Sequence, residues 1–321
     1  MVKLSTWKTV GATSLAAVMF SGVVQADGFG ASPVVFKMYG VNDEGVNNSQ
    51  FFRIDIPGYN LGKTEIHPIG SVYEGFDIEA LDLRVQKEAD NRWHYQLFAS
   101  SGDNDDGADL GCQTGCLYKV SDSGQLTLVG DIVDQIDGTD YSEVDALAFL
   151  PIEPGPILYG WSQNQGLILI DTTSAKAIMV FDSESVADLT DEAEEPQPEP
   201  NKNKHDDGVV EDMTWDNSGT LLYFVRDSDL WVYNTNAMLK HALKKICAPL
   251  AGPSGEAIGE IEGLEMLADE DGALLVLGLH RQNRIDLMAL DPITCEWYGE
   301  INTEESGFND IEGIAAVNPI P

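Results

Sequence analysis

A short motif recurs five times along the chain, and no other feature restricts the fold as strongly. Each copy holds a branched apolar residue, an acidic residue, a usually small residue and another apolar residue. The copies are Ile78–Leu81, Val144–Leu147, Val210–Met213, Ile261–Leu264 and Ile311–Ile314. The acids recur about 50 to 66 residues apart, which is typical of folds built from one supersecondary unit per repeat with insertions.

Segments that read as short strands follow the internal copies of the motif. They are rich in branched and aromatic residues and are bounded by Gly, Asn, Asp or Ser, as strands commonly are. The clearest are Ile157–Trp161, Gly166–Asp171, Ala177–Phe181, Leu221–Val225, Leu230–Tyr233, Ala273–Leu277 and Ile285–Leu290. Each repeat therefore holds three or four strands, as one blade of a β-propeller does.

The fifth copy lies near the end of the chain and leaves room for a single strand. Further strand-like segments precede the first copy, at residues 34–39, 51–56 and 65–69. Pairing of Ile311–Val317 with one of them would complete a fifth blade and remove exposed sheet edges. We therefore predict an all-β, five-bladed propeller over residues 27–321, closed by its N- and C-terminal strands.

Three segments interrupt or decorate this pattern. Residues 183–208 are acidic and rich in Pro, which predicts a surface loop that does not pack. Asp103–Asp109 is a solvated turn or a weak calcium loop, because it lacks the spacing of an EF-hand. The spacing of apolar residues in Asn236–Ile246 predicts a short helix.

The first 26 residues have the features of a secretory signal peptide. Lys3 and Lys8 precede an apolar stretch from Val10 to Val24, and Val24-Gln25-Ala26 supplies a small-x-small cleavage site. The apolar stretch is shorter than the ~20 residues that span a bilayer. We expect a periplasmic or secreted protein without a membrane span, and a monomer.

The chain carries 54 acidic against 18 basic side chains, a formal net charge of −36. Such a chain repels nucleic acid and anionic lipid, which excludes both as partners, and attracts cations. The charge fits divalent-metal binding, and it equally fits a solubilising surface suited to a saline habitat. Both explanations stay open from the sequence.

Four cysteines in an exported chain favour disulfides. Cys112 and Cys116 could close a small loop, which would leave Cys247 and Cys295 as a long-range pair, although four cysteines allow three pairings. A zinc site is the alternative, but none of the five His residues stands at ligand spacing beside a Cys.

The motif acids are the candidate site residues, because equivalent positions in five blades face one central axis. They are Glu79, Asp145, Glu211, Glu262 and Glu312, and further acids stand two positions earlier at Asp77, Glu143, Glu260 and Asp310. Alternation along a strand predicts that each motif acid shares a face with the apolar residues that follow, as Glu79 would with Leu81 and Leu83.

Carboxylates crowded around one axis cannot all stay ionised without compensation. They could accept backbone hydrogen bonds, they could bind Ca²⁺ through six to eight hard oxygen ligands, or two could act as a general acid and base. The same acid recurs in every blade without differentiated neighbours. We therefore expect a binding or scaffold module with Ca²⁺ in the central channel. The alternative is a hydrolase of glycosides, lactones or phosphoesters.

Two of the strands begin with a Glu-Gly pair, at Glu262-Gly263 and Glu312-Gly313. With the predicted closure of the ring, this pattern resembles secreted propellers of the NHL, senescence-marker/lactonase and phytase-like type, over most of the chain. That resemblance implies metal in the central tunnel, on acidic and amide side chains. No His is placed as the lactonases would need, and the Asp-Pro motif that five-bladed glycoside hydrolases carry near the start of a strand is not evident, which weakens a catalytic role.

The ligand could be a protein, a glycan or a small molecule. Trp161, Trp231 and Trp297 could stack on sugars, or they could pack between blades as propeller aromatics commonly do. The sequence contains no Ser-His-Asp set, phosphate loop or haem motif.

Overall fold

The computed structural model describes residues 35–317 with gaps, the longest at 58–63, 103–110, 184–209, 251–257, 281–286 and 302–307. The chain divides into Met1–Pro33 and Val34–Pro321, and the structure describes only the second unit. The expected signal peptide, the Asp103–Asp109 loop and nearly all of the acidic loop at 183–208 therefore lie outside the described residues.

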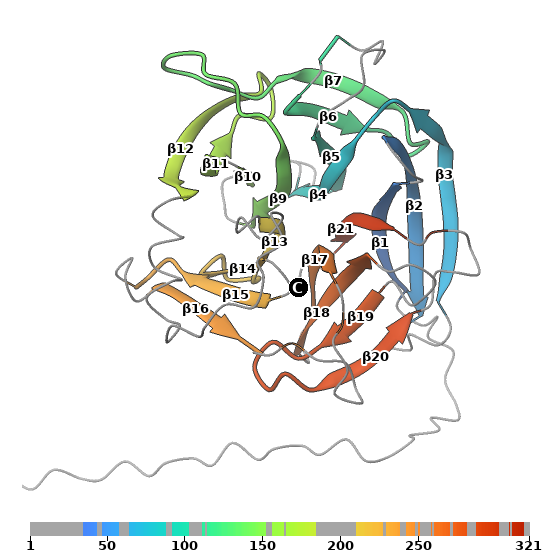
Figure 1. Ribbon diagram of the computed structural model, residues 1–321. Helices are drawn as coiled ribbons and strands as arrows, with labels where there is room; N and C mark the ends of the chain where they lie inside the picture. Colours follow the sequence, from blue (N-terminus) through green and yellow to red (C-terminus); the bar gives the residue numbers. More distant parts are fainter. Residues whose placement is uncertain are drawn as a thin grey trace, which may run out of the picture. The chain divides into compact units, whose positions relative to one another are not determined.

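In the part of the chain that the structure describes, twenty-one strands form five sheets, and each sheet is one blade (Figure 1). From the inner to the outer strand, the first blade contains β4 (Ile78–Lys87), β5 (Trp93–Ser101), β6 (Cys116–Val120) and β7 (Leu126–Asp131). The second contains β9 (Val144–Leu150), β10 (Ile157–Ser162), β11 (Gly166–Ile170) and β12 (Lys176–Asp182), with β8 (Val133–Asp134) parallel to β12. The third contains β13 (Val210–Trp215), β14 (Leu221–Arg226), β15 (Asp229–Asn234) and β16 (Leu243–Ile246).

The fourth blade contains β17 (Glu260–Asp269), β18 (Gly272–His280), β19 (Leu287–Leu290) and β20 (Trp297–Ile301). The fifth contains β21 (Ile311–Val317), β1 (Val35–Asp43), β2 (Asn48–Pro57) and β3 (Glu65–Glu74). Every copy of the motif thus lies in an inner strand, and Figure 1 shows the five inner strands around the centre. The predicted five-bladed β-propeller is confirmed.

The two ends of this unit meet in the fifth blade, which confirms the predicted closure. Strand β21 pairs antiparallel with β1, from Lys37 opposite Val317 to Asn42 opposite Ile311. Ile311 and Ile314 are fully buried in the apolar layer between the fourth and fifth blades. The C-terminal strand is therefore held by a backbone ladder on one side and by core packing on the other.

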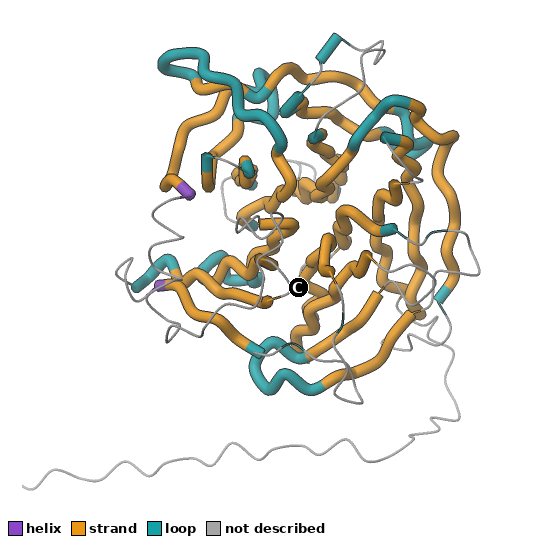
Figure 2. Tube along the Cα trace, viewed as in Figure 1, coloured by secondary structure: helices purple, strands orange, loops and turns teal. Residues whose placement is uncertain are grey.

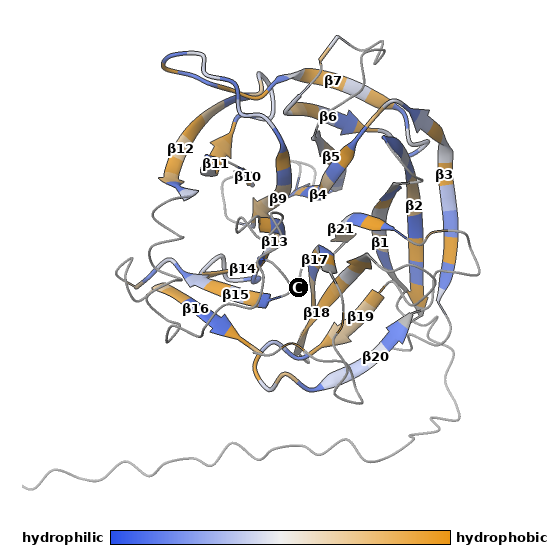
Figure 3. Ribbon diagram, in the orientation of Figure 1, coloured by the Kyte–Doolittle hydropathy of each residue, from blue (hydrophilic) through white to orange (hydrophobic). Residues whose placement is uncertain are grey.

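The core consists of layers between neighbouring blades. One layer joins Phe52 and Ile54 of the fifth blade to Leu274 and Val276 of the fourth. Both faces of a middle strand meet another blade, so β18 is a continuous apolar run, whereas the outer strand β20 exposes alternate residues. Figure 3 shows this difference as a hydrophobic β18 and a largely hydrophilic to neutral β20.

The predicted helix over residues 236–246 is wrong in its last part. Leu243–Ile246 forms β16, which pairs with β15 as the outer strand of the third blade. Residues 238–241 lie outside the described part. Figure 2 shows that the described unit is almost entirely strand and loop. Among the tryptophans named above, Trp161 and Trp231 are buried between blades, so these two are packing residues.

Both disulfides of the preferred pairing are present, Cys112–Cys116 and Cys247–Cys295, with Cα–Cα distances of 6.0 and 5.4 Å. Cys247 directly follows β16 and Cys295 precedes β20, so this bond joins the third blade to the fourth. In the described part of the chain, no helix is long and apolar enough to cross a membrane.

Candidate metal centre

Each motif acid is the extra residue of a β-bulge in its inner strand. In the first blade, Ile78 lies opposite Ser101 and Ala80 opposite Ser100, which leaves Glu79 without a partner residue in β5. The registers of the other inner strands shift in the same way, at Asp145, Glu211, Glu262 and Glu312. A bulge bends the strand and re-aims a side chain, and bulges are common beside functional sites.

The bulges overturn the prediction that a motif acid shares a face with the apolar residues after it. An extra residue shifts the two-residue alternation by one position. Leu81 and Leu83 pack in an apolar cluster that includes Ala315 of the fifth blade. Glu79 instead interacts with the carboxylates of Asp77, Asp145 and Glu262. The apolar residues therefore form the layer between blades, and the acid is free to face the axis.

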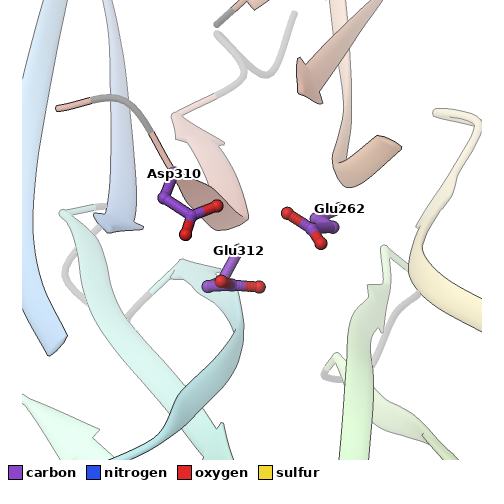
Figure 4. A group of neighbouring side chains, drawn as sticks. All are labelled: Glu262, Asp310 and Glu312. Atoms are coloured by element: carbon purple, nitrogen blue, oxygen red, sulfur yellow. The ribbon is translucent and has the colours of Figure 1, made fainter. Parts of the chain in front are cut away.

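The structure brings the five motif acids together around the channel. Glu79 interacts electrostatically with Asp145 and Glu262, and Asp145 interacts with Glu211. Carboxylate oxygens of Glu262, Asp310 and Glu312 lie within 4.8 Å of one another (Figure 4). We call the whole group the carboxylate ring: it contains Glu79, Asp145, Glu211, Glu262 and Glu312 with the preceding acids Asp77, Glu143 and Asp310. The side chain of Glu260 lies outside the described residues.

Asp145 is the most enclosed of the motif acids, with 6% of its surface exposed. Burial raises the pKa of its carboxyl well above the usual value, and the charges of Glu211, Glu143 and Asp77 raise it further. Its Oδ2 atom is buried and has no hydrogen-bond partner. A buried acceptor left without a donor costs about 1–3 kcal/mol, so this atom marks a place where a cation would be stabilising.

Asp77 and Glu79 form a close pair within the ring. Burial raises the pKa of Glu79 well above its usual value, and the nearby charge of Asp77 and a side-chain hydrogen bond between the two add to the rise. Gly102 lies against both carboxylates: a Cβ atom there would stand 2.8 Å from Glu79 Oε1 and 2.9 Å from Asp77 Oδ2. Only glycine leaves these two carboxyl groups undisturbed.

Buried polar side chains hold the backbone that leads into the inner strands. Ser49 Oγ accepts a hydrogen bond from Ile78 N at 2.9 Å, and Asn42 Oδ1 accepts one from Asp310 N at 2.9 Å. The hydroxyls of Ser100 and Ser162 donate to the carbonyls of Val144 and Ser142. The ring acids therefore project from fixed backbone, which preorganises a site.

A second set of carboxylates, Asp82, Asp212 and Glu265, joins the inner strands of neighbouring blades. Asp82 Oδ2 accepts from Phe149 N, Asp212 Oδ2 accepts from Leu264 N at 2.6 Å, and Glu265 Oε2 accepts from Ala316 N at 2.9 Å. We call these three the brace carboxylates. These three acids thus accept backbone N–H groups from the next blade, the structural role considered for the motif acids.

Sequence reasoning missed the brace carboxylates because acids inside strands read as solvent-facing positions. Burial raises the pKa of Glu265 to about 8, and the charge of Asp82 adds to this, whereas hydrogen bonds from Ala316, Thr214 and Met266 oppose it. Burial raises the pKa of Asp82 to about 6 against the hydrogen bonds from Phe149 and Leu83. Their oxygens are occupied by backbone donors and are poorly placed to serve a ligand.

The donor set of the ring determines which ions it suits. Among the described residues, the one group of acids, His or Cys with the spacing of a metal site is Glu262, Asp310 and Glu312. It offers carboxylate oxygens without nitrogen or sulfur, which suits Ca²⁺ or Mg²⁺ better than zinc. The residues present therefore fit the predicted calcium.

Comparison with known proteins gives structural neighbours of low similarity and no sequence match. No protein-family model matches the sequence, and no curated protein matches it. The structure is similar to the WD40 repeats of RRP9, with TM-score 0.36, 12% identity and coverage of 70% of this chain and 51% of that chain. It is also similar to an auxiliary nutrient-binding protein from Bacteroides ovatus, with TM-score 0.39, 10% identity and coverage of 84% and 57%. This chain spans about half the length of those two chains.

The fold defines the class of this protein as a five-bladed β-propeller. The resemblance to secreted propellers holds at that level, and no family match supports the NHL, senescence-marker/lactonase or phytase-like type.

Proposed function

We propose that this protein is an exported binding or scaffold module whose carboxylate ring binds Ca²⁺ through Glu79, Asp145, Glu211, Glu262 and Glu312. The observation that carries the proposal is the buried Asp145 Oδ2 atom, which has no hydrogen-bond partner, in a carboxyl group that interacts with the charges of Glu211, Glu143 and Asp77. A divalent cation would compensate this charge, because an opposite charge within a few ångströms favours the ionised form of an acid.

The repeated bulge supports a role for the ring beyond folding. The brace carboxylates join inner strands at three of the blade boundaries through backbone donors, whereas the motif acids are the extra residues of bulges. They are instead turned toward one another, where their like charges oppose folding. An arrangement that is costly in the absence of a ligand and that recurs in all five blades is what a cation site requires.

Thermal unfolding with and without Ca²⁺ tests the proposal. A ligand that binds only the folded state stabilises it by about 2.7 kcal/mol at one hundred times its Kd. For a domain of this size that corresponds to a rise in Tm of roughly 5–10 °C. Purified protein stripped with chelator should show this rise when millimolar Ca²⁺ is added.

The double variant Glu211→Gln/Glu262→Gln should abolish the rise and remain folded. Glu300→Gln is the matched control, because it makes the same chemical change at an exposed position of the outer strand β20. The proposal is wrong if Ca²⁺ leaves the Tm of the unmodified protein unchanged, or if the double variant responds as fully as the control.

A second candidate function, hydrolysis of glycosides, lactones or phosphoesters, is favoured by the Asp77–Glu79 pair. The hydrogen bond between the two carboxyl groups and the raised pKa of Glu79 would place a proton donor beside a second carboxyl, as general acid–base catalysis requires. The test is a panel of these three substrate classes. If turnover is lost in Glu79→Gln and kept in Glu300→Gln, the protein is an enzyme and the proposal of a binding module is wrong.

Export and a binding role agree with several further features. Two disulfides are typical of oxidising compartments, and the signal-like sequence at residues 1–26 predicts passage across a membrane. The partner we propose is a protein, a glycan or a small molecule that meets a strongly acidic monomer. Fractionation of cells that express the full chain, with mass measurement of its N-terminus, tests export and cleavage after Ala26.

A further inference from the structure

The disulfide Cys247–Cys295 connects the outer edges of two neighbouring blades. Cys247 directly follows β16, the outer strand of the third blade, and Cys295 lies in the turn before β20, the outer strand of the fourth. Figure 1 shows β16 and β20 at the outside of adjacent blades, whereas the carboxylate ring belongs to the inner strands. The bond is therefore a feature of the rim of the propeller, separate from the ring.

Both cysteines of this bond have a left-handed backbone, with φ of +54° at Cys247 and +59° at Cys295. Residues other than glycine disfavour this region, because the Cβ atom comes too close to the backbone carbonyl. Only five non-glycine residues of the described part have a positive φ, and two of them form this one disulfide. Cys112 and Cys116 are not among them. Backbone strain is thus concentrated at one of the two disulfides.

The turn that contains Cys295 explains its backbone. Cys295 N donates to Asp291 O at 2.8 Å, and Ala175 N donates to Asp171 O at 2.8 Å in the equivalent turn of the second blade, where Ala175 has φ +54°. In the corresponding turn of the first blade, Gly124 has φ +76°. The turn therefore forms without a cysteine, and glycine suits this position best. The bond to Cys247 is what a cysteine adds here.

The same disulfide is also the more accessible one. Cys247 and Cys295 are partly exposed, and the residues on both sides of Cys295 in the chain are exposed. Cys112 and Cys116 are 4% and 0% exposed. Thiol–disulfide exchange requires a thiolate to reach a sulfur atom, and strained or exposed disulfides are the labile ones. Strain and access therefore both favour exchange at Cys247–Cys295.

Strand β16 has few other attachments to the fourth blade. It pairs with β15 over four residues, and Lys245 Nζ lies 2.6 Å from Asp229 Oδ2, so both contacts stay within the third blade. Ile246 and Trp297 are partly buried against the apolar layer between the third and fourth blades. Cleavage of the disulfide would leave β16 free to move away from β20 and would uncover the edge of this layer.

We propose that Cys247–Cys295 is a reversible exchange site for a dithiol reductant, and that its reduction loosens the outer part of the boundary between the third and fourth blades. One thiolate of the dithiol attacks one sulfur of the pair, the protein S–S bond breaks, and a mixed disulfide forms while the other cysteine leaves as a thiolate. The second thiol of the dithiol then displaces the remaining cysteine. The dithiol ends as a disulfide, and its two electrons and two protons leave the protein with two thiols. This site is independent of Ca²⁺ binding by the carboxylate ring.

Timed alkylation of the folded, purified full chain tests the exchange. The protein is treated with dithiothreitol and sampled into iodoacetamide, and the cysteine peptides are quantified by mass spectrometry. Cys247 and Cys295 should become alkylated at least about tenfold faster than Cys112 and Cys116, because exchange rates follow access. The inference is wrong if the two disulfides are reduced at the same rate or if Cys112–Cys116 is reduced first.

Hydrogen–deuterium exchange tests the structural consequence, because it reports local opening strand by strand. In the protein reduced at Cys247–Cys295, peptides from β16 and β20 should exchange about tenfold faster than in the oxidised protein. Peptides from β4 and β5 should not change, and reoxidation with oxidised glutathione should restore the original rates. Equal exchange in both forms, or equal acceleration in all blades, contradicts the proposed loosening.

Variants provide the matched controls. Cys247→Ser/Cys295→Ser should exchange as the reduced protein does, whereas Cys112→Ser/Cys116→Ser should keep the oxidised pattern at β16 and β20. Cys247→Ser/Cys295→Gly should melt roughly 2 °C higher than Cys247→Ser/Cys295→Ser, because glycine accepts the left-handed backbone of the turn. If it melts no higher, the backbone of Cys295 is not strained and the inference is wrong. Reduction of the unmodified protein decides the question even if a variant fails to fold.

Discussion

Replacement of Glu265 by Gln tests a contact that holds the closing strand β21 in place independently of any bound metal. Glu265 Oε2 accepts from Ala316 N in β21, and Oε1 accepts from Met266 N at 2.6 Å and Thr214 Oγ at 2.9 Å. Either oxygen of a carboxyl group can accept, even when the group is protonated. A Gln side chain has one oxygen, so its amide nitrogen must face a backbone N–H in a site that is 5% exposed.

A buried N–H without an acceptor costs about 1–3 kcal/mol, and we expect Glu265→Gln to destabilise the protein by that amount. For a domain of this size the Tm should fall on the order of 5 °C. Urea unfolding at pH 7, followed by the fluorescence of the buried Trp161 and Trp231, gives the free energy of unfolding.

Glu300→Gln makes the same change on an exposed strand and should stay within about 0.5 kcal/mol of the unmodified protein. If Glu265→Gln unfolds at the same urea concentration as that control, the bond to Ala316 does not hold the closing strand, and the role given to the brace carboxylates is wrong.

Three further perturbations follow from the same geometry. Burial raises the folded pKa of Glu265 to about 8 and that of Asp82 to about 6, so the folded state binds more protons than the unfolded chain. Each group therefore lowers stability as pH rises from its ordinary pKa near 4 to its folded pKa, by up to about 1.4 kcal/mol per pH unit. Urea unfolding between pH 4 and pH 8 should show this slope, reduced in Glu265→Gln, and a flat profile would contradict the burial of these acids. Gly102→Ala places a methyl group against the Glu79 carboxylate and should weaken Ca²⁺ binding severalfold by calorimetry, whereas unchanged affinity would separate that carboxyl from the site. Ile314→Ala should cost about 2–5 kcal/mol by urea unfolding, because the buried side chain leaves a cavity in the layer beside β17, and a loss below 1 kcal/mol would mean that closure depends little on core packing.

The fold could be predicted because the sequence pattern that determines it repeats at regular intervals along the chain. Five copies of one motif predicted the number of blades. The last copy, at residues 311–314, has no further strands after it, whereas extra strands precede the first copy, and this predicted the closure. The choice of candidate site residues followed from the same periodicity, since equivalent positions in a ring must converge. Neither inference needed a side-chain contact, which is why both could be made from residue types and spacing alone.

The orientation of the motif acids could not be predicted in the same way, because a bulge changes the alternation without changing the composition of a strand. A clue existed in the small residue that follows four of the five motif acids. At Gly313, a Cβ atom would stand 2.8 Å from Leu81 N in the next inner strand, so glycine marks the close approach of β21 and β4. The clue gives spacing between strands but not the direction of the neighbouring acid.

The sequence did not predict the brace carboxylates or strand β16, for a different reason. Glu265 and Asp212 are acids in strands that their neighbours bury, and only the tertiary structure reveals the backbone N–H groups that compensate them. The segment before Cys247 has helical spacing of apolar residues, but the third blade needs an outer strand there, and Leu243–Ile246 provides it. Tertiary pairing overrode the local pattern.

The most direct test of the account is a crystal structure of the protein grown in millimolar Ca²⁺, with an anomalous difference map to locate the ion. The account predicts a peak among the carboxylates of Glu79, Asp145, Glu211, Glu262 and Glu312, with ligand oxygens at about 2.3–2.6 Å. It is contradicted if the ring carboxylates are well ordered and the map shows no ion among them, with the acids hydrogen-bonded to one another or to water instead.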